Sequence, residues 1–489
     1  MDDQAKLEAL YGPNAQFKPG QQEALSALKA GHHAIALLPT GGGKSLIYQL
    51  FQYQSTGLTV IVSPLVALMQ DQVAQLQRLG IKRAVALNST LNHSEQQQVL
   101  QQLGQYQFLF LSPEMIDRPQ IIGILKQQEI HLLVIDEAHC ISQWGFDFRV
   151  EYSELIQVRR KLNQPLTLAL TATATEKALQ DIQKFLFYPF ETVETVKVSL
   201  DRPNIFYATK QVNEANKIYT LTHDLVTLPK PGIVYVHNKA EADQLEHLLT
   251  QETTLKVASY HADYSPEDRY SIQQQFQSGQ LEVILATSAF GMGINQGDIR
   301  FVIHYHLPLT LADLIQEIGR SGRDGAQACG MTYYNPEELA RLNYFKIGQY
   351  WPVEEFYPLL MQVFDTSLTA IATQLELAES VLSLLAFYQR HFSSATQAIA
   401  HYRHFLQIKQ KEVTQVQAYC QTNECLRQHL LRAFDETLTN RSKFCCQNDQ
   451  PDYQTTAEWT AYLASGRRKP QIPSYKLTPW QDRLGALLG

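Results

Sequence analysis

Short apolar runs recur between residue 34 and about residue 200, and stretches with helical spacing separate them. A run that is apolar at every position predicts a strand covered on both faces, as in a parallel sheet. Between two such runs, Leu65, Leu68, Met69 and Val73 have the spacing of an amphipathic helix. The predicted strands are residues 34–38, 59–62, 108–111, 132–135 and 166–170.

A second alternating series begins after residues 201–204 (DRPN), which read as a hinge. Its predicted strands are residues 232–236, 257–260, 283–286 and 301–305. The fold class is therefore α/β, with two tandem parallel-sheet domains followed by a helical C-terminal subdomain. The expected boundaries are residues 1–202, 203–342 and 343–450, with a weakly ordered tail at 451–489 that is rich in Pro, Asp, Gln and Thr.

A glycine-rich turn follows the first predicted strand. Residues 39–45 read PTGGGKS, and Lys-Ser would open the next helix, which is the arrangement of a phosphate-binding loop. The backbone of Thr40 and of the three glycines, Gly41, Gly42 and Gly43, would surround phosphate oxygens. Lys44 would reach the β- and γ-phosphates, and the Ser45 hydroxyl would bind Mg²⁺.

An acidic pair ends another apolar run. Asp136 is expected to hold Mg²⁺ and Glu137 to orient the attacking water. With the glycine-rich turn, this pair predicts that the chain hydrolyses a nucleoside triphosphate.

The second domain carries two arginines in the string QEIGRSGRDG. Gln316, Arg320 and Arg323 are spaced at i, i+4 and i+7, so on a helix they would share one face. Guanidinium groups from a second domain suit the charge that develops on the γ-phosphate. The alternative is a solvated basic helix face that forms surface ion pairs.

Together these motifs resemble superfamily 2 helicases, and several longer strings resemble the RecQ-type DNA helicases. The resemblance covers about residues 10–340 and implies two RecA-like domains with ATP between them. The strings that carry it are FKPGQQ (17–22), VSPLVALMQDQV (62–73), CISQWGFDFR (140–149), TATAT (171–175) and ATSAFGMGIN (286–295).

The resemblance also implies roles for residues outside the three motifs. Gln21 would read the adenine and Lys18 would lie near the nucleotide. The loop after the acidic pair would couple DNA binding to ATP hydrolysis. Its candidate DNA-binding residues are Ser142, Gln143, Trp144, Phe146, Phe148 and Arg149.

The aromatic side chains of this loop also have a physical meaning without the family. Trp144, Phe146 and Phe148 alternate with polar residues, and aromatic rings that stack on bases contribute about 1–3 kcal/mol each. A buried core cluster is the competing interpretation. Phe146 stands where the family has histidine, which bears on the coupling rather than on stacking.

Four of the six cysteines lie between residues 420 and 446. RecQ proteins carry zinc in a helical subdomain at this place, and Cys425, Cys445 and Cys446 are the candidate ligands. The family triplet spacing instead reaches Cys446, Asp449 and Asp452, so the cysteine set is incomplete. The alternative is a subdomain that packs without metal.

Residues 367–385 have helix-turn-helix spacing, as in an insert that touches duplex DNA or in a plain helical spacer. Only 43 residues follow Cys446, which predicts a short form without a full winged-helix or HRDC domain. The net charge of −7 implies that DNA is contacted through local patches.

The sequence shows no signal peptide and no membrane span, so we expect a cytoplasmic, nucleoid-associated monomer. The resemblance implies an ATP-dependent helicase that binds single-stranded and duplex DNA, moves 3′→5′ and acts in DNA repair and recombination. An RNA helicase and a non-catalytic nucleic-acid-binding protein are the competing interpretations.

Overall fold

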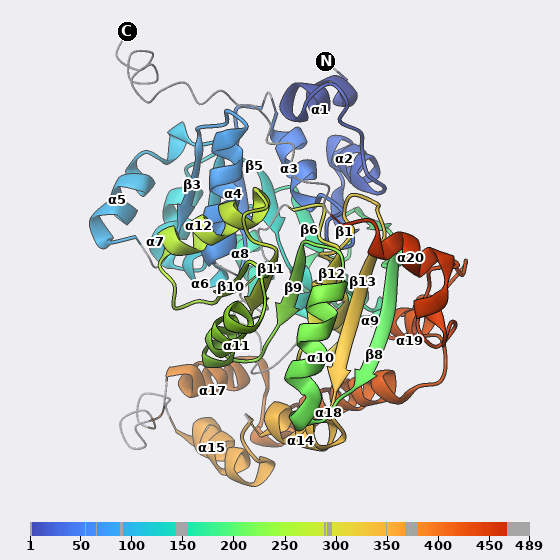
Figure 1. Cartoon of the computed structure of the whole chain (residues 1–489). Helices are drawn as coiled ribbons and strands as arrows, with labels where there is room; N and C mark the ends of the chain where they lie inside the picture. Colours follow the sequence, from blue (N-terminus) through green and yellow to red (C-terminus); the bar gives the residue numbers. More distant parts are fainter. Residues whose placement is uncertain are drawn as a thin grey trace.

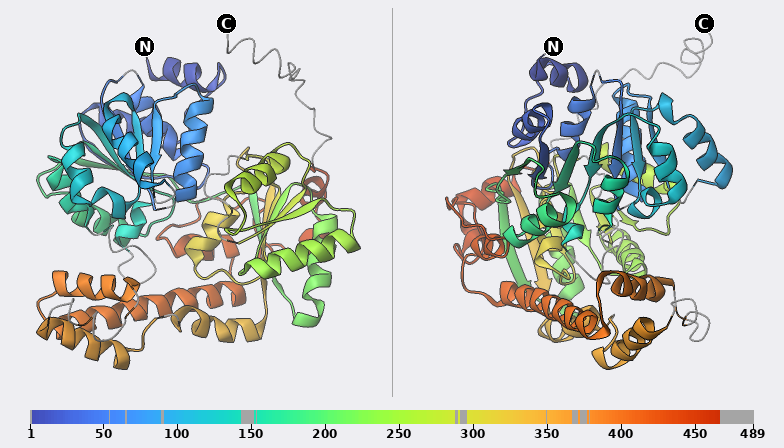
Figure 2. Two further views of the ribbon diagram at one scale, coloured as in Figure 1. Left: turned by 90° about the vertical axis from the view of Figure 1, so that its left-hand side faces the viewer. Right: turned by 180° about the vertical axis from the view of Figure 1, so that it is seen from behind.

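The fold was derived from a computed structural model that describes residues 2–466. Within this range it leaves out residues 54, 65, 89–90, 143–151, 153, 288–289, 291–295, 349, 367–370, 372–376 and 378. Two sheet lobes lie against each other, and helices from the C-terminal third run below both (Figures 1 and 2).

Lobe 1 is built on a seven-stranded sheet in the order β3-β4-β2-β5-β6-β1-β7, and every neighbouring pair is parallel. The strands are β1 (His33–Leu37), β2 (Leu58–Val62), β3 (Ala84–Leu87), β4 (Phe108–Leu111), β5 (Ile130–Ile135), β6 (Thr167–Thr171) and β7 (Val193–Lys197). The central strands are buried on both faces, as their apolar runs predict. In a parallel sheet all carboxyl ends meet at one edge, so the loops after β1 and β5 lie together.

Helices cover both faces of this sheet. They are α1 (Asp3–Tyr11), α2 (Gln21–Lys29), α3 (Lys44–Gln52), α4 (Val66–Arg78), α5 (His93–Gln101), α6 (Pro113–Ile116), α7 (Pro119–Leu125), the 3-10 turn η2 (Ala138–Ile141), α8 (Leu155–Lys161) and α9 (Glu176–Leu186). Short polar side chains begin several of them. For example, Thr175 accepts a hydrogen bond from the Ala178 N–H at the start of α9, which satisfies one free donor of the helix end.

Lobe 2 has a six-stranded parallel sheet in the order β10-β11-β9-β12-β13-β8. Its strands are β8 (Ile205–Gln211), β9 (Gly232–Tyr235), β10 (Val257–Tyr260), β11 (Val283–Ala286), β12 (Phe301–His304) and β13 (Ala328–Tyr334). The helices are α10 (Glu214–Thr227), α11 (Lys239–Glu252), α12 (Pro266–Gln277) and α13 (Leu311–Ile318). The predicted two-domain α/β class is confirmed.

The helical region begins at α14 (Pro336–Ile347). It continues with α15 (Val353–Asp365), α17 (Glu379–His391), α18 (Ala395–Gln421) and α19 (Leu426–Arg432). Phe356, Tyr388 and Tyr402 form the centre of a core shared by α15, α17 and α18. Most of the turn in the expected helix-turn-helix, residues 367–376, lies outside the described residues, so that prediction stays open.

The chain after α19 returns to lobe 2 and covers its edge strand. The Tyr207 N–H donates to the Cys445 carbonyl, and the Gln447 N–H donates to the Tyr207 carbonyl, so residues 445–447 extend the sheet at β8. Beyond them, η4 (Tyr453–Thr455) and α20 (Ala457–Leu463) place Trp459 and Tyr462 in the core of lobe 2.

The tail expected at 451–489 is therefore wrong for residues 453–463, which are helical and packed. The expectation followed the Pro, Asp, Gln and Thr content. Three aromatic residues inside that composition, Tyr453, Trp459 and Tyr462, supply enough apolar surface to hold the segment on lobe 2.

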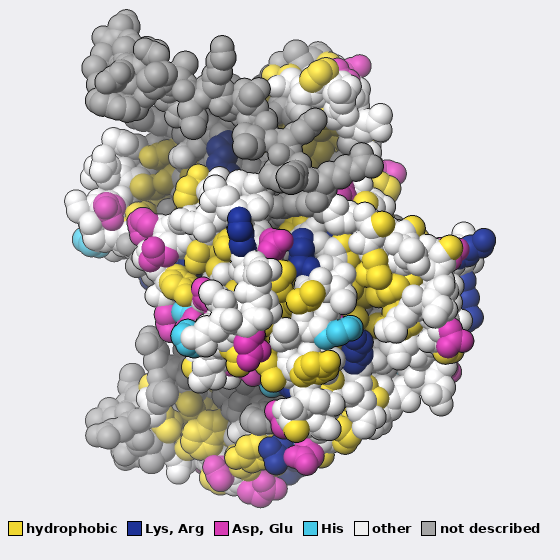
Figure 3. All heavy atoms as spheres, viewed as in Figure 1, with side chains coloured by type: hydrophobic (Ala, Val, Ile, Leu, Met, Phe, Trp, Pro, Cys, Tyr) yellow, Lys and Arg dark blue, Asp and Glu magenta, His cyan; other side chains and the backbone are white. Residues whose placement is uncertain are grey.

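On the side seen in Figure 3, the described Lys and Arg side chains form no large basic patch. They lie scattered among polar and apolar ones. This agrees with the net charge of −7. None of the described helices has the length and apolar character needed to cross a membrane.

Candidate active site

A cavity of about 450 Å³ lies between the two lobes. Lobe 1 contributes the glycine-rich turn (39–45), Asp136 and Glu137, and lobe 2 contributes Gln316, Arg320 and Arg323. The three motifs that sequence reasoning proposed separately thus line a single space. Lys18, Gln21 and Tyr11 also line it.

The glycine-rich turn leaves β1 and enters α3 at Lys44. Gly41 and Gly43 have φ values of +81° and +71°, a region that favours glycine. A Cβ on Gly41 would lie 2.9 Å from the Arg323 Cδ, so this glycine also permits the close approach of lobe 2. The α3 N-terminus and the Lys44 ammonium face the cavity, as a phosphate site requires.

Lys18 and Gln21 contact this turn directly. The Lys18 Nζ donates to the Gly41 carbonyl over 2.8 Å. The Gln21 Nε2 donates to the carbonyls of Gly42 and Gly43 over 2.9 and 3.0 Å. Both side chains are thus engaged by the backbone of the glycine-rich turn.

Asp136 and Glu137 follow β5 at the carboxyl edge of the sheet. Burial and the Glu137 carboxylate raise the pKa of Asp136 to about 6. Burial also opposes ionisation of Glu137, but Lys44 and His139 outweigh it and hold its pKa below the usual range. The Lys44 Nζ lies 3.6 Å from the Glu137 Oε1. Two desolvated carboxylates beside the Ser45 hydroxyl form an oxygen-rich site that suits Mg²⁺.

His139 lies between the acidic pair and the end of β6. Its Nδ1 is 3.0 Å from the Thr171 Oγ1 and 3.3 Å from the Glu137 Oε2. The ring thereby connects the Glu137 carboxylate to the TATAT string.

The arginine pair departs from the predicted helix face. Helix α13 ends at Ile318, and Gly319 begins a turn that carries Arg320 and Arg323. The i, i+4, i+7 argument was therefore wrong in its geometry, because the chain leaves the helix after Gly319 and turns at Gly322, whose φ is +58°. The turn still brings both arginines to the cavity, which Gln316 lines from α13.

Positive charge is crowded around this cavity. Burial and repulsion from Arg320 and Arg202 lower the pKa of Arg323 to about 9. Burial and the neighbouring Arg323 and Arg202 also lower the pKa of Lys18. A polyanion would relieve both effects, which is the electrostatic signature of a phosphate site.

Of the candidate DNA-binding residues, Ser142 alone lies within the described part of the chain. Its hydroxyl donates to the Asp181 Oδ2 over 2.8 Å, so it braces the start of the loop against α9. Gln143, Trp144, Phe146, Phe148 and Arg149 lie outside the described residues.

Tyr48 is a cavity residue that sequence reasoning missed. It is buried on α3, its hydroxyl donates to the Gln72 Oε1 over 3.1 Å, and it also hydrogen-bonds the Ser45 hydroxyl. A serine that binds a cation through a lone pair must direct its hydrogen elsewhere, and the Tyr48 oxygen can accept it. Its position one helical turn after Ser45 was the available signal.

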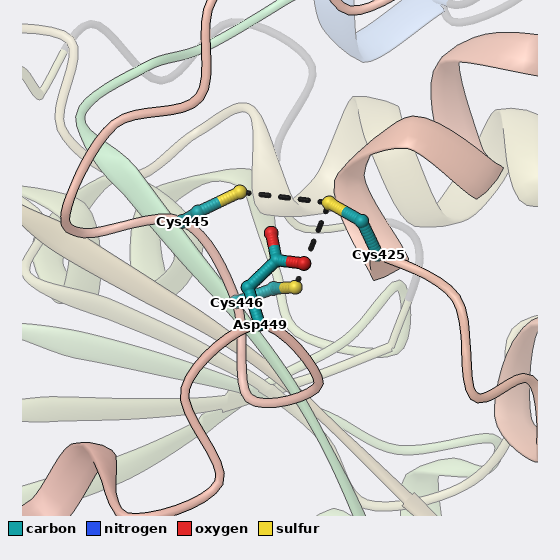
Figure 4. A group of neighbouring side chains, drawn as sticks. All are labelled: Cys425, Cys445, Cys446 and Asp449. Carbon is teal, nitrogen blue, oxygen red and sulfur yellow. Dashed lines mark hydrogen bonds between the residues drawn. The ribbon is translucent and has the colours of Figure 1, made fainter.

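Three cysteines and one aspartate form a compact cluster beside β8 (Figure 4). The Cys425 Sγ lies 3.6 Å from the Cys445 Sγ and 3.7 Å from the Cys446 Sγ. Tetrahedral zinc with bonds of about 2.3 Å separates two sulfurs by about 3.8 Å, so this spacing fits zinc. Asp449 is the fourth member, whereas Cys420 and Asp452 are not part of the cluster.

A second group of possible ligands, His237, His306 and Glu338, is satisfied without metal. His306 lies 2.6 Å from Glu241 and 2.9 Å from Glu338, and these hydrogen bonds outweigh burial and raise its pKa to about 9. The Lys217 ammonium is 3.7 Å from Glu338. Two cations thus balance two carboxylates.

Comparisons with known proteins agree with this geometry. Residues 18–182 match the DEAD/DEAH box helicase family and residues 216–325 match the helicase conserved C-terminal domain. The chain is 40% identical over 480 residues to the probable ATP-dependent DNA helicase RecS of Bacillus subtilis, covering 96% of this chain and 94% of that protein. It is 37% identical to the ATP-dependent DNA helicase RecQ of Haemophilus influenzae, over 69% of this chain and 54% of that protein.

The fold is also similar to the Mycobacterium smegmatis helicase Lhr, solved with single-stranded DNA and AMP-PNP. The TM-score is 0.55 at 18% identity, over 79% of this chain and 58% of that one. The chain spans about half of the RecQ protein from Haemophilus influenzae. The RecS match along nearly the whole chain, the RecQ match and the two helicase domains show the family. The chain belongs to the RecQ family of ATP-dependent DNA helicases in superfamily 2.

Proposed function

We propose that this chain hydrolyses Mg-ATP between its lobes, moves 3′→5′ along single-stranded DNA, and unwinds duplexes in DNA repair and recombination. The observation that carries the proposal is the crowding of Lys18, Lys44, Arg320 and Arg323 around a glycine-rich turn in one cavity. The polarity and the cellular role follow the family resemblance.

Each cavity residue has a role in this proposal. Lys44 and the backbone of residues 40–43 hold the phosphates, while Ser45 and Asp136 would hold Mg²⁺, which would neutralise phosphate charge. Glu137 orients the attacking water. Arg320 and Arg323 stabilise the charge that develops on the γ-phosphate when the lobes are closed, and Gln316 lies beside them. Gln21 reads the adenine, and Lys18 lies near the nucleotide.

The test is the ATPase activity of Lys44→Ala with single-stranded DNA. We expect a loss of at least about 100-fold, because Lys44 contacts the transferred phosphoryl group. Lys161→Ala removes an exposed lysine of lobe 1 and serves as the matched control. Unchanged turnover in the Lys44 variant would reject the assignment of the site.

Polarity and substrate class need a second experiment. Duplexes with a 3′ or a 5′ single-stranded tail, in DNA and in RNA of one sequence, separate the possibilities. Unwinding of the 3′-tailed DNA alone is the expected result. Preference for the RNA duplex would favour an RNA helicase, and absence of both hydrolysis and unwinding would favour a non-catalytic binding protein.

The cysteine cluster completes the proposal. Cys425, Cys445 and Cys446 with Asp449 as the fourth ligand would hold one zinc ion and join α19 to residues 445–449 beside β8. Metal analysis of the purified chain tests this, with one zinc per chain expected and none in Cys425→Ser. We further propose that the chain acts as a monomer and that its ATP-binding lobe ends near residue 202.

A further inference from the structure

Arg202 lies in the segment that joins β7 to β8, which the sequence presents as a hinge. Its guanidinium is engaged by four backbone carbonyls. The Nη1 donates to Gly319 over 2.9 Å, and the Nη2 donates to Ser321 and Gly322 over 3.0 and 2.8 Å. A longer contact of 3.4 Å joins the Nη1 to the Thr40 carbonyl.

The first three carbonyls belong to the turn that carries Arg320 and Arg323. This turn lies beyond the end of α13, where the N–H groups of Arg320 and Ser321 still donate to Glu317 and Ile318. Carbonyls at a helix end have no helical partner, and Arg202 supplies donors to three of them from outside. The Asn204 Nδ2 adds bonds to Gly322 and Ala326, both of 2.8 Å. The hinge segment therefore holds the backbone of the arginine turn.

The fourth carbonyl belongs to the glycine-rich turn of lobe 1. A Cβ on Gly319 would lie 3.3 Å from the Thr40 Cβ, so the two turns touch at this point. Arg202 thus bonds to both sides of the ATP cavity, and its contact with Thr40 depends on the lobes being close.

The helical region also contacts the segment that joins β7 to β8. Arg427, two residues into α19, pairs with Asp201, with the Nη2 2.6 Å from the Oδ2. Glu436 accepts hydrogen bonds from the Ser199 hydroxyl and the Leu200 N–H over 2.7 and 3.1 Å. Helix α19 starts directly after Cys425, so a chain of contacts connects the cysteine cluster to Arg202.

We propose that Arg202 is a positioning residue for the arginine pair, and that the Asp201–Arg427 ion pair makes its position depend on the helical C-terminal region. The inference rests on the proposed ATPase function. Arg202 acts by fixing the turn that carries Arg320 and Arg323 and by joining it to the glycine-rich turn. Arg427 acts one step further away, through Asp201.

The main test is the substitution Arg202→Met, measured as DNA-stimulated ATP hydrolysis and as equilibrium binding of Mg-ADP. We expect kcat to fall 10- to 100-fold while the Kd for Mg-ADP changes less than about threefold, because the turn serves the transition state. Arg202→Lys keeps the charge without the planar fork and should recover only part of kcat. If Arg202→Met does not fold, Arg202→Lys is judged by the same two measurements.

A double-mutant cycle separates positioning from a general loss of structure. If Arg202 acts through Arg323, then Arg202→Met adds less than threefold to the loss caused by Arg323→Met. If the double variant instead loses the product of the two single losses in kcat, the proposal is overturned. A wild-type kcat in Arg202→Met would overturn it as well. A wild-type chain without ATPase activity would instead refute the proposed function.

The link to the helical region is tested by two variants of α19, Arg427→Met and its control Arg432→Met. Arg427→Met should lower kcat three- to tenfold, and less than threefold when Arg202→Met is already present. Arg432→Met lies on the same helix, in an exposed ion pair with Glu424, and should leave kcat unchanged. Equal kcat values for Arg427→Met and wild type would show that neither Arg427 nor the cysteine cluster affects the position of Arg202.

Discussion

Neutralising Arg323 should stabilise the nucleotide-free protein while it abolishes turnover. Burial and repulsion from Arg320 and Arg202 lower the pKa of Arg323 from its usual value to about 9. At about 1.4 kcal/mol per pKa unit, this corresponds to at most about 5 kcal/mol of unfavourable energy for the charged form. Water in the open cavity and salt screen part of it, so we expect an observable effect of about 1–2 kcal/mol.

Arg323→Met tests this directly. Methionine keeps methylene groups where the Arg323 side chain lies against Gly41 but removes the charge. Without nucleotide, the midpoint of thermal unfolding should rise by a few degrees, and the rise should shrink at high salt. With ATP and DNA, kcat should fall by about 10³ or more, the contribution of an arginine that stabilises a transferring phosphoryl group.

The assay is thermal unfolding at low and high salt, with and without Mg-ADP, together with steady-state hydrolysis. Arg341→Met removes an exposed arginine of α14 and should change neither quantity. If Arg323→Met instead melts several degrees below wild type without nucleotide, then Arg323 is a net stabilising contact. The electrostatic reasoning for a polyanion site would then fail.

Three further results are expected. Tyr48→Phe should raise the Mg²⁺ concentration for half-maximal ATPase about threefold or more, because the Ser45 hydroxyl loses its acceptor; an unchanged Mg²⁺ dependence would remove Tyr48 from the metal site. Trp459→Ala should lower the free energy of unfolding of lobe 2 by about 3–5 kcal/mol, and a loss below about 1 kcal/mol would mean that α20 is dispensable. The pKa of His306 is raised from 6.5 to about 9 in the folded state, so its contribution, at most about 3 kcal/mol, is complete below pH 6.5 and is lost as the pH rises through 9. Chemical denaturation of wild type and His306→Gln at pH 6 and pH 9.5 checks this, and equal pH dependence of both would contradict it.

Strand positions in the sheet centres followed from the sequence because those strands are apolar at every residue. β4, β10 and β11 begin and end where the runs predict. The edge strand β7 was missed, since none of its residues is buried and two of them, Glu194 and Lys197, are charged. β13 was missed as well, because Gly330 and Thr332 interrupt its apolar character.

The cavity residues were found because phosphate chemistry leaves a local signature of glycine, lysine, serine and paired acids. What the sequence did not show is the partner of each charge. The sequence placed Arg202 in a hinge and gave no role to Arg427, because their contacts with carbonyls and with Asp201 arise only between distant segments. Asp449 was found at the family triplet spacing but left out of the candidate ligands, because cysteine was expected at its position.

The return of residues 444–463 to lobe 2 has a consequence for biosynthesis. Phe444, Tyr453, Trp459 and Tyr462 complete a core whose other members end at Tyr333. At about 5–20 residues per second, the ribosome needs roughly 6–25 s to make the intervening stretch of about 130 residues. During that interval the nascent lobe exposes the β8 edge and an apolar face, which makes this the stage at which the newborn chain is most open to chaperones and to mispairing.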